Sequence, residues 1–308
     1  MRFTDMADEM FGAAQGALPA GVRLATAKRG GVTITRVEIA REGLAKPRGR
    51  YVTLEMPSVS VLDERDAAVI ETCAAELRAL LPPEGPVLVL GIGNRRVTAD
   101  ALGPRTAQKI LVTMGPQHTL PVKGIRPVAA IAPGVSASTG LTLRQLAGAM
   151  VEAVRPAALI CVDSLCSAEG ARLGRSVQFS DTGLYPAQAD HAKHLDAAAL
   201  GVPVIAAGIP TLMDSDEGAD LVVTPRALDS VIAHGSALLA GAINRALQPR
   251  LSVAQLFWLA GEHRGAGREV ILCAAKHCRP PGRRGISCRF WKRLLCLPHC
   301  ASLPARRH

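Results

Sequence analysis

Two uninterrupted apolar runs constrain the fold of this chain more than any other feature of its sequence. Val87–Leu90 is apolar at every position and ends at Gly91, and Ala158–Val162 is apolar throughout and ends at Asp163. Strands of this kind are typical of parallel sheets with helices on both faces, because neither side of such a strand meets water. The runs therefore predict an α/β fold with an open, mostly parallel sheet and helices on both faces.

Helical and extended patterns alternate along the rest of the chain. Helical spacing of apolar residues predicts helices at residues 63–81, 142–154 and 226–247. Short apolar runs predict further buried strands at residues 128–132, 204–207 and 221–223. Alternation of polar and β-branched residues predicts a strand pair at residues 31–39 and 50–55. Strands that alternate with helices support an open α/β sheet.

The positive charge of the chain is concentrated at its C-terminal end. The formal net charge is +10, and residues 262–308 hold eleven Lys and Arg against two Glu, a local balance of +9. The preceding residues are therefore close to neutral, and we expect no direct nucleic-acid partner for the fold. We predict one α/β domain at residues 1–261 and a basic, cysteine-rich tail at residues 262–308 that is disordered or foreign to the fold.

Cysteine usage and the chain start indicate an intracellular protein. Five of the eight cysteines lie in the tail near His277 and His299, but no CxxC pair occurs, so a zinc site is not favoured there. The first residues have no apolar signal region, and no stretch reaches the roughly 18 apolar residues of a membrane span. We expect a cytoplasmic location, no membrane contact and no cofactor.

Carboxylates are rare around the two apolar runs. Between residues 85 and 165 the acidic residues are Asp100, Glu152 and Asp163, and Glu152 is expected on the solvent face of a helix. Ligands of open α/β sheets gather beyond the carboxyl ends of the strands, so Asp100 and Asp163 could converge in one crevice. Two close carboxylates share a proton and can activate water against a peptide carbonyl. The alternatives are a helix-terminus role for Asp100, with Thr98 as the cap, and a loop hydrogen bond for Asp163.

The other motifs give weaker evidence of function. The Gly91–Asn94 turn lacks the third glycine of a dinucleotide fingerprint, so a tight turn after a strand is favoured. Asp181–Gly183 matches the Asp-Thr-Gly of pepsin-like proteases, but those are all-β and this tripeptide has no second copy, so an Asp turn is favoured. Cys161 and Cys166 are interpreted as packing residues. Asp190, His191 and His194 match no established metal-ligand spacing.

Several blocks, in order, resemble the bacterial spore germination protease family over roughly residues 20 to 261. The blocks are Tyr51–Glu55, Gly91–Asn94 with Val97–Pro104, Ile131–Val135, Ser180–Gly183, Gly201–Ile205 with Gly208–Thr211, and Leu221–Pro225. No single block is specific, but the ordered set is.

The resemblance implies an endopeptidase that degrades small acid-soluble spore proteins during germination, by a two-aspartate, water-activating mechanism. It implies a homotetramer in the forespore or spore core, made as a zymogen. The family's proposed catalytic aspartates fall on Asp100 and Asp163. The family's fold is similar to that of hydrogenase-maturation proteases, in which equivalent acidic positions hold nickel; for this chain a metal-free mechanism is expected.

The chain departs from the family pattern in three places. Arg2–Ala7 resembles the family's N-terminal block but leaves almost no room for a propeptide before it, residues 185–190 replace a glycine-rich loop, and the tail from Glu262 has no counterpart. Two alternatives stay open. One is a hydrogenase-maturation-type endopeptidase that recognises a bound metal, and the other is a catalytically silent relative that binds spore proteins or nucleic acid through its tail.

Overall fold

A computed structural model describes residues 3–12, 18–62, 66–115, 124–185, 194–215 and 221–266. The chain separates into two compact units, Met1–Trp258 and Leu259–His308. The first unit contains the sheet and both aspartates singled out above. The cysteines of the predicted tail lie outside the described residues.

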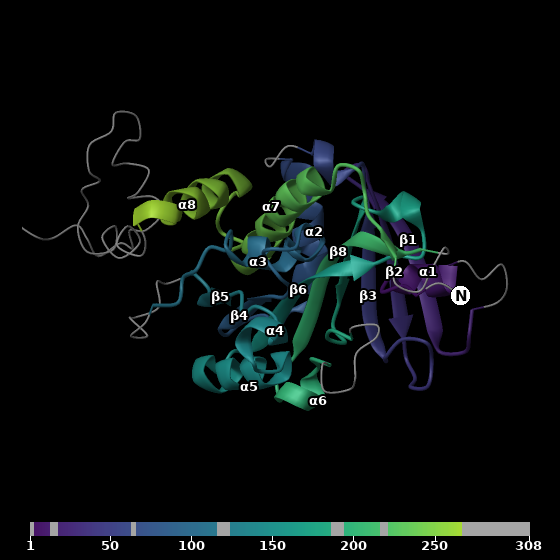
Figure 1. Cartoon of the computed structure of the whole chain (residues 1–308), viewed down its shortest axis with the longest axis horizontal. Coiled ribbons are helices and arrows are strands. Elements are labelled where there is room, and N and C mark those ends of the chain that lie inside the picture. The colour runs from purple at the N-terminus through teal and green to yellow at the C-terminus, as the bar shows by residue number, and fades with distance from the viewer. Residues whose placement is uncertain are drawn as a thin grey trace, which may run out of the picture. The chain divides into compact units, whose positions relative to one another are not determined.

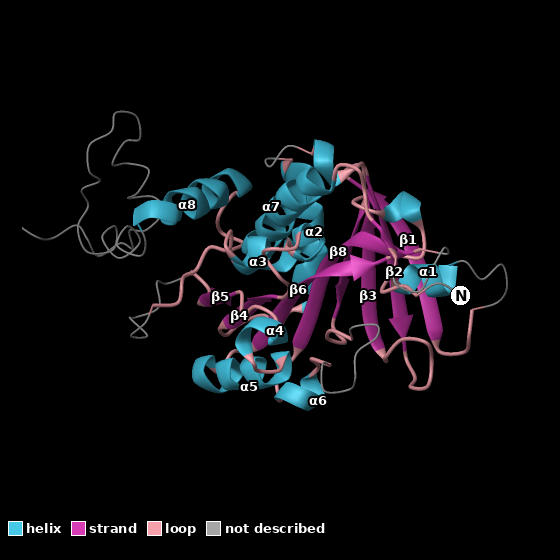
Figure 2. Cartoon of the chain, in the orientation of Figure 1, coloured by secondary structure: helices cyan, strands magenta, loops and turns pink. Residues whose placement is uncertain are grey.

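The described strands form one mixed sheet (Figures 1 and 2). In chain order they are β1 (Val22–Arg29), β2 (Val32–Ile39), β3 (Gly49–Glu55), β4 (Val87–Gly91), β5 (Val128–Ile131), β6 (Ala158–Cys166), β7 (Ser176–Ser180), β8 (Val204–Asp214) and β9 (Val222–Val223). Their spatial order is β1-β2-β3-β7-β8-β6-β4-β5, with β9 paired to β8. Strands β8, β6, β4 and β5 run parallel, and the remaining pairings are antiparallel.

Helices cover both faces of the parallel half. The helices are α1 (Ala7–Gly12), α2 (Ala67–Leu80), α3 (Leu102–Ala107), α4 (Ser136–Thr139), α5 (Leu143–Val154), α6 (Ala197–Leu200), α7 (Leu228–Leu247) and α8 (Val253–Ala266). Single 3-10 turns are η1 (Val59–Val61), η2 (Thr98–Asp100) and η3 (Gly170–Arg172). Within the described part of the chain, no helix combines the length and apolar character that crossing a membrane requires.

The surroundings of strand β4 explain why residues 87–90 are all apolar. Val87 and Val89 pack in the core that includes α2, α3 and α7, whereas Leu88 and Leu90 pack in the core beneath α5. Side chains of a strand alternate between faces, so two covered faces require an apolar residue at every position. The predicted α/β fold is confirmed, with the parallel half of a mixed sheet as its buried centre (Figure 2).

Local signals set the helix boundaries. Thr142 caps α5 through a capping box, in which its side chain accepts from the Gln145 N–H and the Gln145 side chain accepts from the Thr142 N–H. Helix α2 ends at Leu80, two residues before Pro82, because a proline cannot continue the backbone hydrogen bonding. It begins at Ala67, within the predicted range.

Strand β6 is longer than the sequence predicted. The apolar run ends at Val162, but the strand continues to Cys166, so Asp163 lies inside it and not at its end. The reason is that β8 goes on pairing with it, and Asp163 lies opposite Gly208 in the parallel register. The residues at positions 163 and 164 are half-buried, whereas the other residues of β6 are buried.

Strand β9 was predicted to be buried, and this prediction was wrong. Leu221, Val222 and Val223 are 56%, 57% and 42% exposed. The strand has only two residues and pairs with the last residues of β8, Met213 and Asp214. Its apolar sequence therefore did not indicate its exposure.

Candidate functional site

The turn after β4 brings Asp100 back toward the sheet. Gly93 has φ +121°, a conformation that residues with side chains rarely adopt, and an added Cβ would lie 2.1 Å from the Asp100 carbonyl oxygen. The Asn94 N–H donates to Asp100 Oδ2 at 2.7 Å. The predicted tight turn is therefore present, and its glycine makes room for the aspartate. Thr98 is the first residue of η2 and Val97 is its cap position, so the expectation that Thr98 caps this turn was wrong.

A second glycine seats the next helix directly on the sheet. A Cβ at Gly103 would lie 2.3 Å from both the Ile92 and the Val162 carbonyl oxygens. No side chain fits there, so α3 begins in contact with the backbone just after β4 and in the middle of β6. The segment that carries Asp100 is thereby held over β6, the strand of Asp163.

The two predicted aspartates come together where η2 lies against β6. Burial is the main reason that the pKa of Asp163 lies well above its usual range, and the charge of nearby Asp100 raises it further. The Ser164 N–H, which donates to Asp163 Oδ1 at 2.8 Å, opposes this shift. Burial also raises the pKa of Asp100, against the hydrogen bond from Asn94. The pair therefore favours binding a proton over carrying two negative charges.

A third carboxylate, from the start of the chain, lies near this pair. The Asp5 N–H donates to the Cys166 carbonyl at 2.9 Å, and the Cys166 N–H donates to Asp5 Oδ2 at 2.7 Å. Burial raises the pKa of Asp5, Lys46 opposes that shift, and the Asp5 charge adds a smaller upward shift to the pKa of Asp163. The sequence reasoning missed Asp5, although the family-like block at Arg2–Ala7 contains it.

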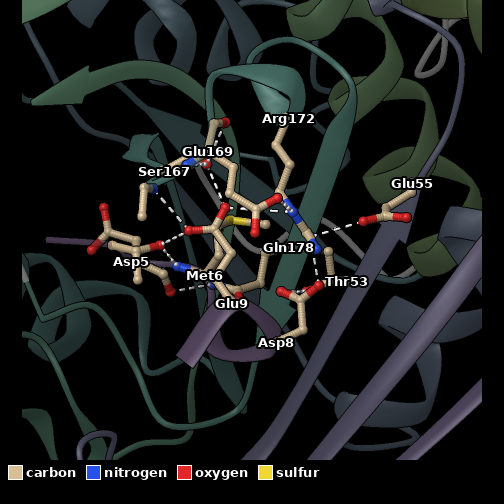
Figure 3. Close-up of polar contacts among 12 residues, drawn as sticks. Asp5, Met6, Asp8, Glu9, Thr53, Glu55, Ser167, Glu169, Arg172 and Gln178 are labelled. Atoms are coloured by element: carbon tan, nitrogen blue, oxygen red, sulfur yellow. Dashed lines mark hydrogen bonds and ion pairs between the residues drawn. The ribbon is translucent and has the colours of Figure 1, made fainter. Parts of the chain in front are cut away.

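The segment that follows Asp5 is fixed by Arg172 (Figure 3). The guanidinium of Arg172 lies 2.6 Å from Asp8, 2.9 Å from Glu55, 3.2 Å from Glu169 and 3.5 Å from Glu9. Asp8 and Glu9 belong to α1 and are 4% and 6% exposed. Arg172 of η3 thus forms ion pairs with carboxylates of α1, of β3 and of its own loop. Buried carboxylates need such partners to be stable in their charged form.

Neutral groups complete the contacts of Glu9. Thr4 Oγ1 donates to Glu9 Oε2 at 2.5 Å, the Ala168 N–H donates to the same oxygen at 2.8 Å, and the Ser167 hydroxyl donates to Glu9 Oε1. The Ala7 N–H donates to Gln178 Oε1 at 2.8 Å. The N-terminal segment is therefore bonded to β6 and β7 of the sheet, close to Asp163.

The other motifs have structural roles. Asp181 accepts from the Arg50 N–H and from Arg50 Nε, both at 2.7 Å, so its side chain is bonded to β3, and the predicted local Asp turn stays a prediction. Cys161 and Cys166 are buried, and burial raises the pKa of the Cys166 thiol to about 11. A thiol is a weak nucleophile in that state, in agreement with packing roles.

Metal ligation was also considered at these positions. The His194 ring lies 4.7 Å from the Tyr185 ring, and Asp190 and His191 lie outside the described residues. Among the residues that the structure describes, no group of three or more His, Cys, Asp or Glu side chains is arranged to hold a metal ion. The described donor groups around Asp100 and Asp163 therefore do not form a three-ligand nickel or zinc site.

One comparison with solved structures gives a distant match. The chain aligns with the [NiFe] hydrogenase maturation protease HycI from Thermococcus kodakarensis with a TM-score of 0.35 and 17% identity, over 55% of this chain and 98% of that one. A TM-score this low supports no residue-by-residue correspondence.

Sequence comparisons give much stronger matches. The model of the family described as "Germination protease" matches residues 7–217. A germination protease of Clostridium perfringens strain 13 is 32% identical over 282 residues, which cover 71% of this chain and 86% of that protein. The germination protease of Priestia megaterium is 35% identical over 228 residues, which cover 70% of this chain and 60% of that protein. The chain belongs to the germination protease family of peptidases.

Proposed function

We propose that this chain is an endopeptidase that cleaves small acid-soluble spore proteins during germination, with Asp100 and Asp163 as its acid–base pair. The observation that carries the proposal is the placement of these carboxylates beside neighbouring parallel strands, where each has a raised pKa and Asp100 contributes to the shift of Asp163. Family membership supports the peptidase activity. The substrate class rests on the resemblance of the ordered blocks.

The chemistry follows from one shared proton. Asp163, with its strongly raised pKa, holds the proton, and Asp100, which accepts the Asn94 N–H, is the ionised partner. Asp100 takes a proton from a water molecule as the water oxygen attacks the peptide carbonyl carbon, while Asp163 gives its proton to the carbonyl oxygen. Asp100 then protonates the leaving amine, and a hydroxyl of the tetrahedral intermediate returns a proton to Asp163. The cycle restores the starting protonation states.

No step of this mechanism passes through a metal ion. Among the described residues, no group of three or more His, Cys, Asp or Glu side chains is arranged to hold one. The hydrogenase-maturation-type alternative predicts that recognition requires nickel, so the two mechanisms separate in a metal-dependence experiment.

The finer family properties belong to the same proposal. We infer a homotetramer, made as a zymogen in the forespore and active in the spore core, on the strength of the resemblance alone. Activation would act close to the site, because the N-terminal segment pairs through Asp5 with the strand that carries Asp163.

The proposed activity is tested with a purified small acid-soluble spore protein. We expect the full chain to cut it at a few internal peptide bonds, detected by mass spectrometry, at the same rate with and without chelator. An unrelated unfolded protein, such as reduced casein, controls for indiscriminate proteolysis. Cleavage that disappears with chelator and returns with nickel would contradict the metal-free mechanism. Equal cleavage of both proteins would contradict the proposed substrate class.

A further inference from the structure

Two hydroxyl groups hold the turn that carries Asp100. Ser164 Oγ on β6 donates to the Ala99 carbonyl at 2.7 Å, and Thr211 Oγ1 on β8 donates to the same oxygen at 3.2 Å. A carbonyl oxygen has two lone pairs and can accept both bonds. Thr211 is fully buried, so its hydroxyl has no access to water as an alternative partner.

The position of this junction relates it to the aspartate pair. Ala99 directly precedes Asp100, and Ser164 directly follows Asp163. The Ser164–Ala99 bond therefore joins the neighbour of one aspartate to the neighbour of the other. The bonds that the carboxylates themselves accept from Asn94 and Ser164 are each local, six and one residues apart in the chain. These two local bonds orient each carboxylate but do not set the separation between the two.

The 3-10 turn η2 is too short for its own hydrogen bonds to hold its position over the sheet. η2 has three residues and no side-chain cap, and a single 3-10 turn of this kind has poor hydrogen-bond geometry. Its place over the sheet therefore depends on bonds to neighbouring elements. The Ala99 carbonyl provides two of them, one to each of two adjacent parallel strands.

We propose that Ser164 and Thr211 are positioning residues, which hold Asp100 against Asp163 through the Ala99 carbonyl. This inference rests on the proposed function and deepens it, because it names residues that set the geometry of the pair without contacting the substrate. Catalytic groups displaced by about 1 Å can lose about 100-fold in rate, so a flexible turn is expected to be costly.

The test compares variants that remove a hydroxyl with variants that keep it. Ser164→Ala and Thr211→Val remove the donors, Ser164→Thr and Thr211→Ser retain them, and Thr72→Val is the matched control. Thr72 also donates to a carbonyl, that of Ala68 at 2.8 Å, but within α2. For cleavage of the spore protein we expect kcat to fall about 10- to 100-fold in Ser164→Ala and Thr211→Val, with KM within about two-fold. We expect Thr211→Ser to recover most of the rate and Thr72→Val to leave it unchanged.

The pH profile gives a readout that a merely structural role would not move. Asp163 faces Asp100 from η2 and Asp5 from the N-terminal segment, and it shares β6 with the thiol of Cys161; Asp5 in turn faces Lys46, Glu9 and Asp214. Of these interactions, a more mobile η2 weakens only the one between the Asp100 and Asp163 carboxyl groups. The two apparent pKa values of the pair should then move toward each other, and the bell-shaped profile of kcat should become narrower in Ser164→Ala.

The outcomes separate this inference from the function on which it rests. If Asp100→Asn and Asp163→Asn both stay active, the proposed function fails. If those variants are inactive while the Ser164→Ala, Thr211→Val double variant keeps the wild-type kcat and pH profile within about two-fold, the positioning role is overturned. An equal loss in Thr72→Val would overturn it as well. Should Ser164→Ala fail to fold, the contrast between Thr211→Ser and Thr211→Val decides the question, and equal rates contradict the proposal.

Discussion

Asp163 has an unfavourable surrounding for an ionised side chain. Burial and the charge of Asp100 both raise its pKa, and burial also raises the pKa of Asp100 and Asp5. A carboxyl whose pKa is raised on folding adds stability in its protonated form, at pH values below its unfolded pKa. That contribution is lost as the pH rises through the folded pKa, because the folded state then has to carry the charge. The raised pKa values of these carboxyls therefore lower the free energy of unfolding at neutral and higher pH.

Removing this charge should stabilise the fold. We expect Asp163→Asn to raise the melting temperature at pH 8, by about 2–4 °C for each 1 kcal/mol gained in a chain of this size. Near pH 3 the difference should shrink, because the wild-type carboxyl is then protonated in both the folded and unfolded states. Thermal unfolding at the two pH values checks this, with Glu152→Gln on the exposed face of α5 as the control. A lower melting temperature of Asp163→Asn at pH 8 would show that burial does not dominate.

At the scale of elements, the site depends on where strands and turns meet. The apolar runs predicted β4 and β6 and their parallel pairing with helices on both faces, because covered strands need apolar residues throughout. The continuation of β6 through Asp163 was missed, since polar residues after an apolar run suggest a strand end. The pairing of Asp5 with Cys166 was also missed, because no local pattern reports a contact between segments so far apart in the chain.

The close contact of α3 with the sheet gives a steric prediction. Gly103→Ala should destabilise the fold by about 1–3 kcal/mol or more, because the new methyl group meets two backbone carbonyls that cannot move aside. Gly148→Ala is the matched control: it lies in α5 with open space around the added Cβ, and it should be stabilising by up to about 1 kcal/mol. Denaturant unfolding of both variants measures the contrast. Equal stabilities would contradict the close approach of α3 to β4 and β6.

The charge cluster around α1 gives a second prediction at this scale. Arg172→Ala leaves Asp8 and Glu9 buried without their cation, so we expect a loss of about 3–5 kcal/mol in the free energy of unfolding. Arg23→Ala is the control, because the exposed Arg23–Glu38 pair should contribute less than about 1 kcal/mol. Hydrogen exchange of residues 3–11 should rise in Arg172→Ala alone. Unchanged protection of that segment would mean that Arg172 does not hold it.

At the scale of the whole molecule, the two halves of the mixed sheet have different structural roles. The parallel half, β8-β6-β4-β5, brings the two aspartates together through β6 and the turn after β4, and the antiparallel half, β1-β2-β3-β7, supports α1 and the N-terminal segment. Burial patterns in the sequence identified the strands of the first half and singled out the two aspartates, whose catalytic role is a proposal. The order in which the halves join, through β7 and β8, comes from contacts that the sequence pattern does not encode locally.

The division into a domain at residues 1–261 and a tail at residues 262–308 remains a prediction. If the tail is separate from the catalytic fold, a chain lacking residues 262–308 should keep its melting temperature and its cleavage rate, measured by calorimetry and by the spore-protein assay. The catalytically silent alternative predicts the opposite: function would be lost with the tail and would survive Asp100→Asn.

The most direct test of the central claim is the cleavage of a small acid-soluble spore protein by Asp100→Asn, Asp163→Asn and Glu152→Gln. These residues are the three carboxylates between positions 85 and 165, so the substitutions are chemically matched. We predict that both aspartate variants fold and lose at least about 100-fold in kcat, since each removes a group that transfers a proton. Glu152→Gln should cleave at the wild-type rate. Cleavage at near wild-type rates by either folded aspartate variant would contradict the assignment of the pair.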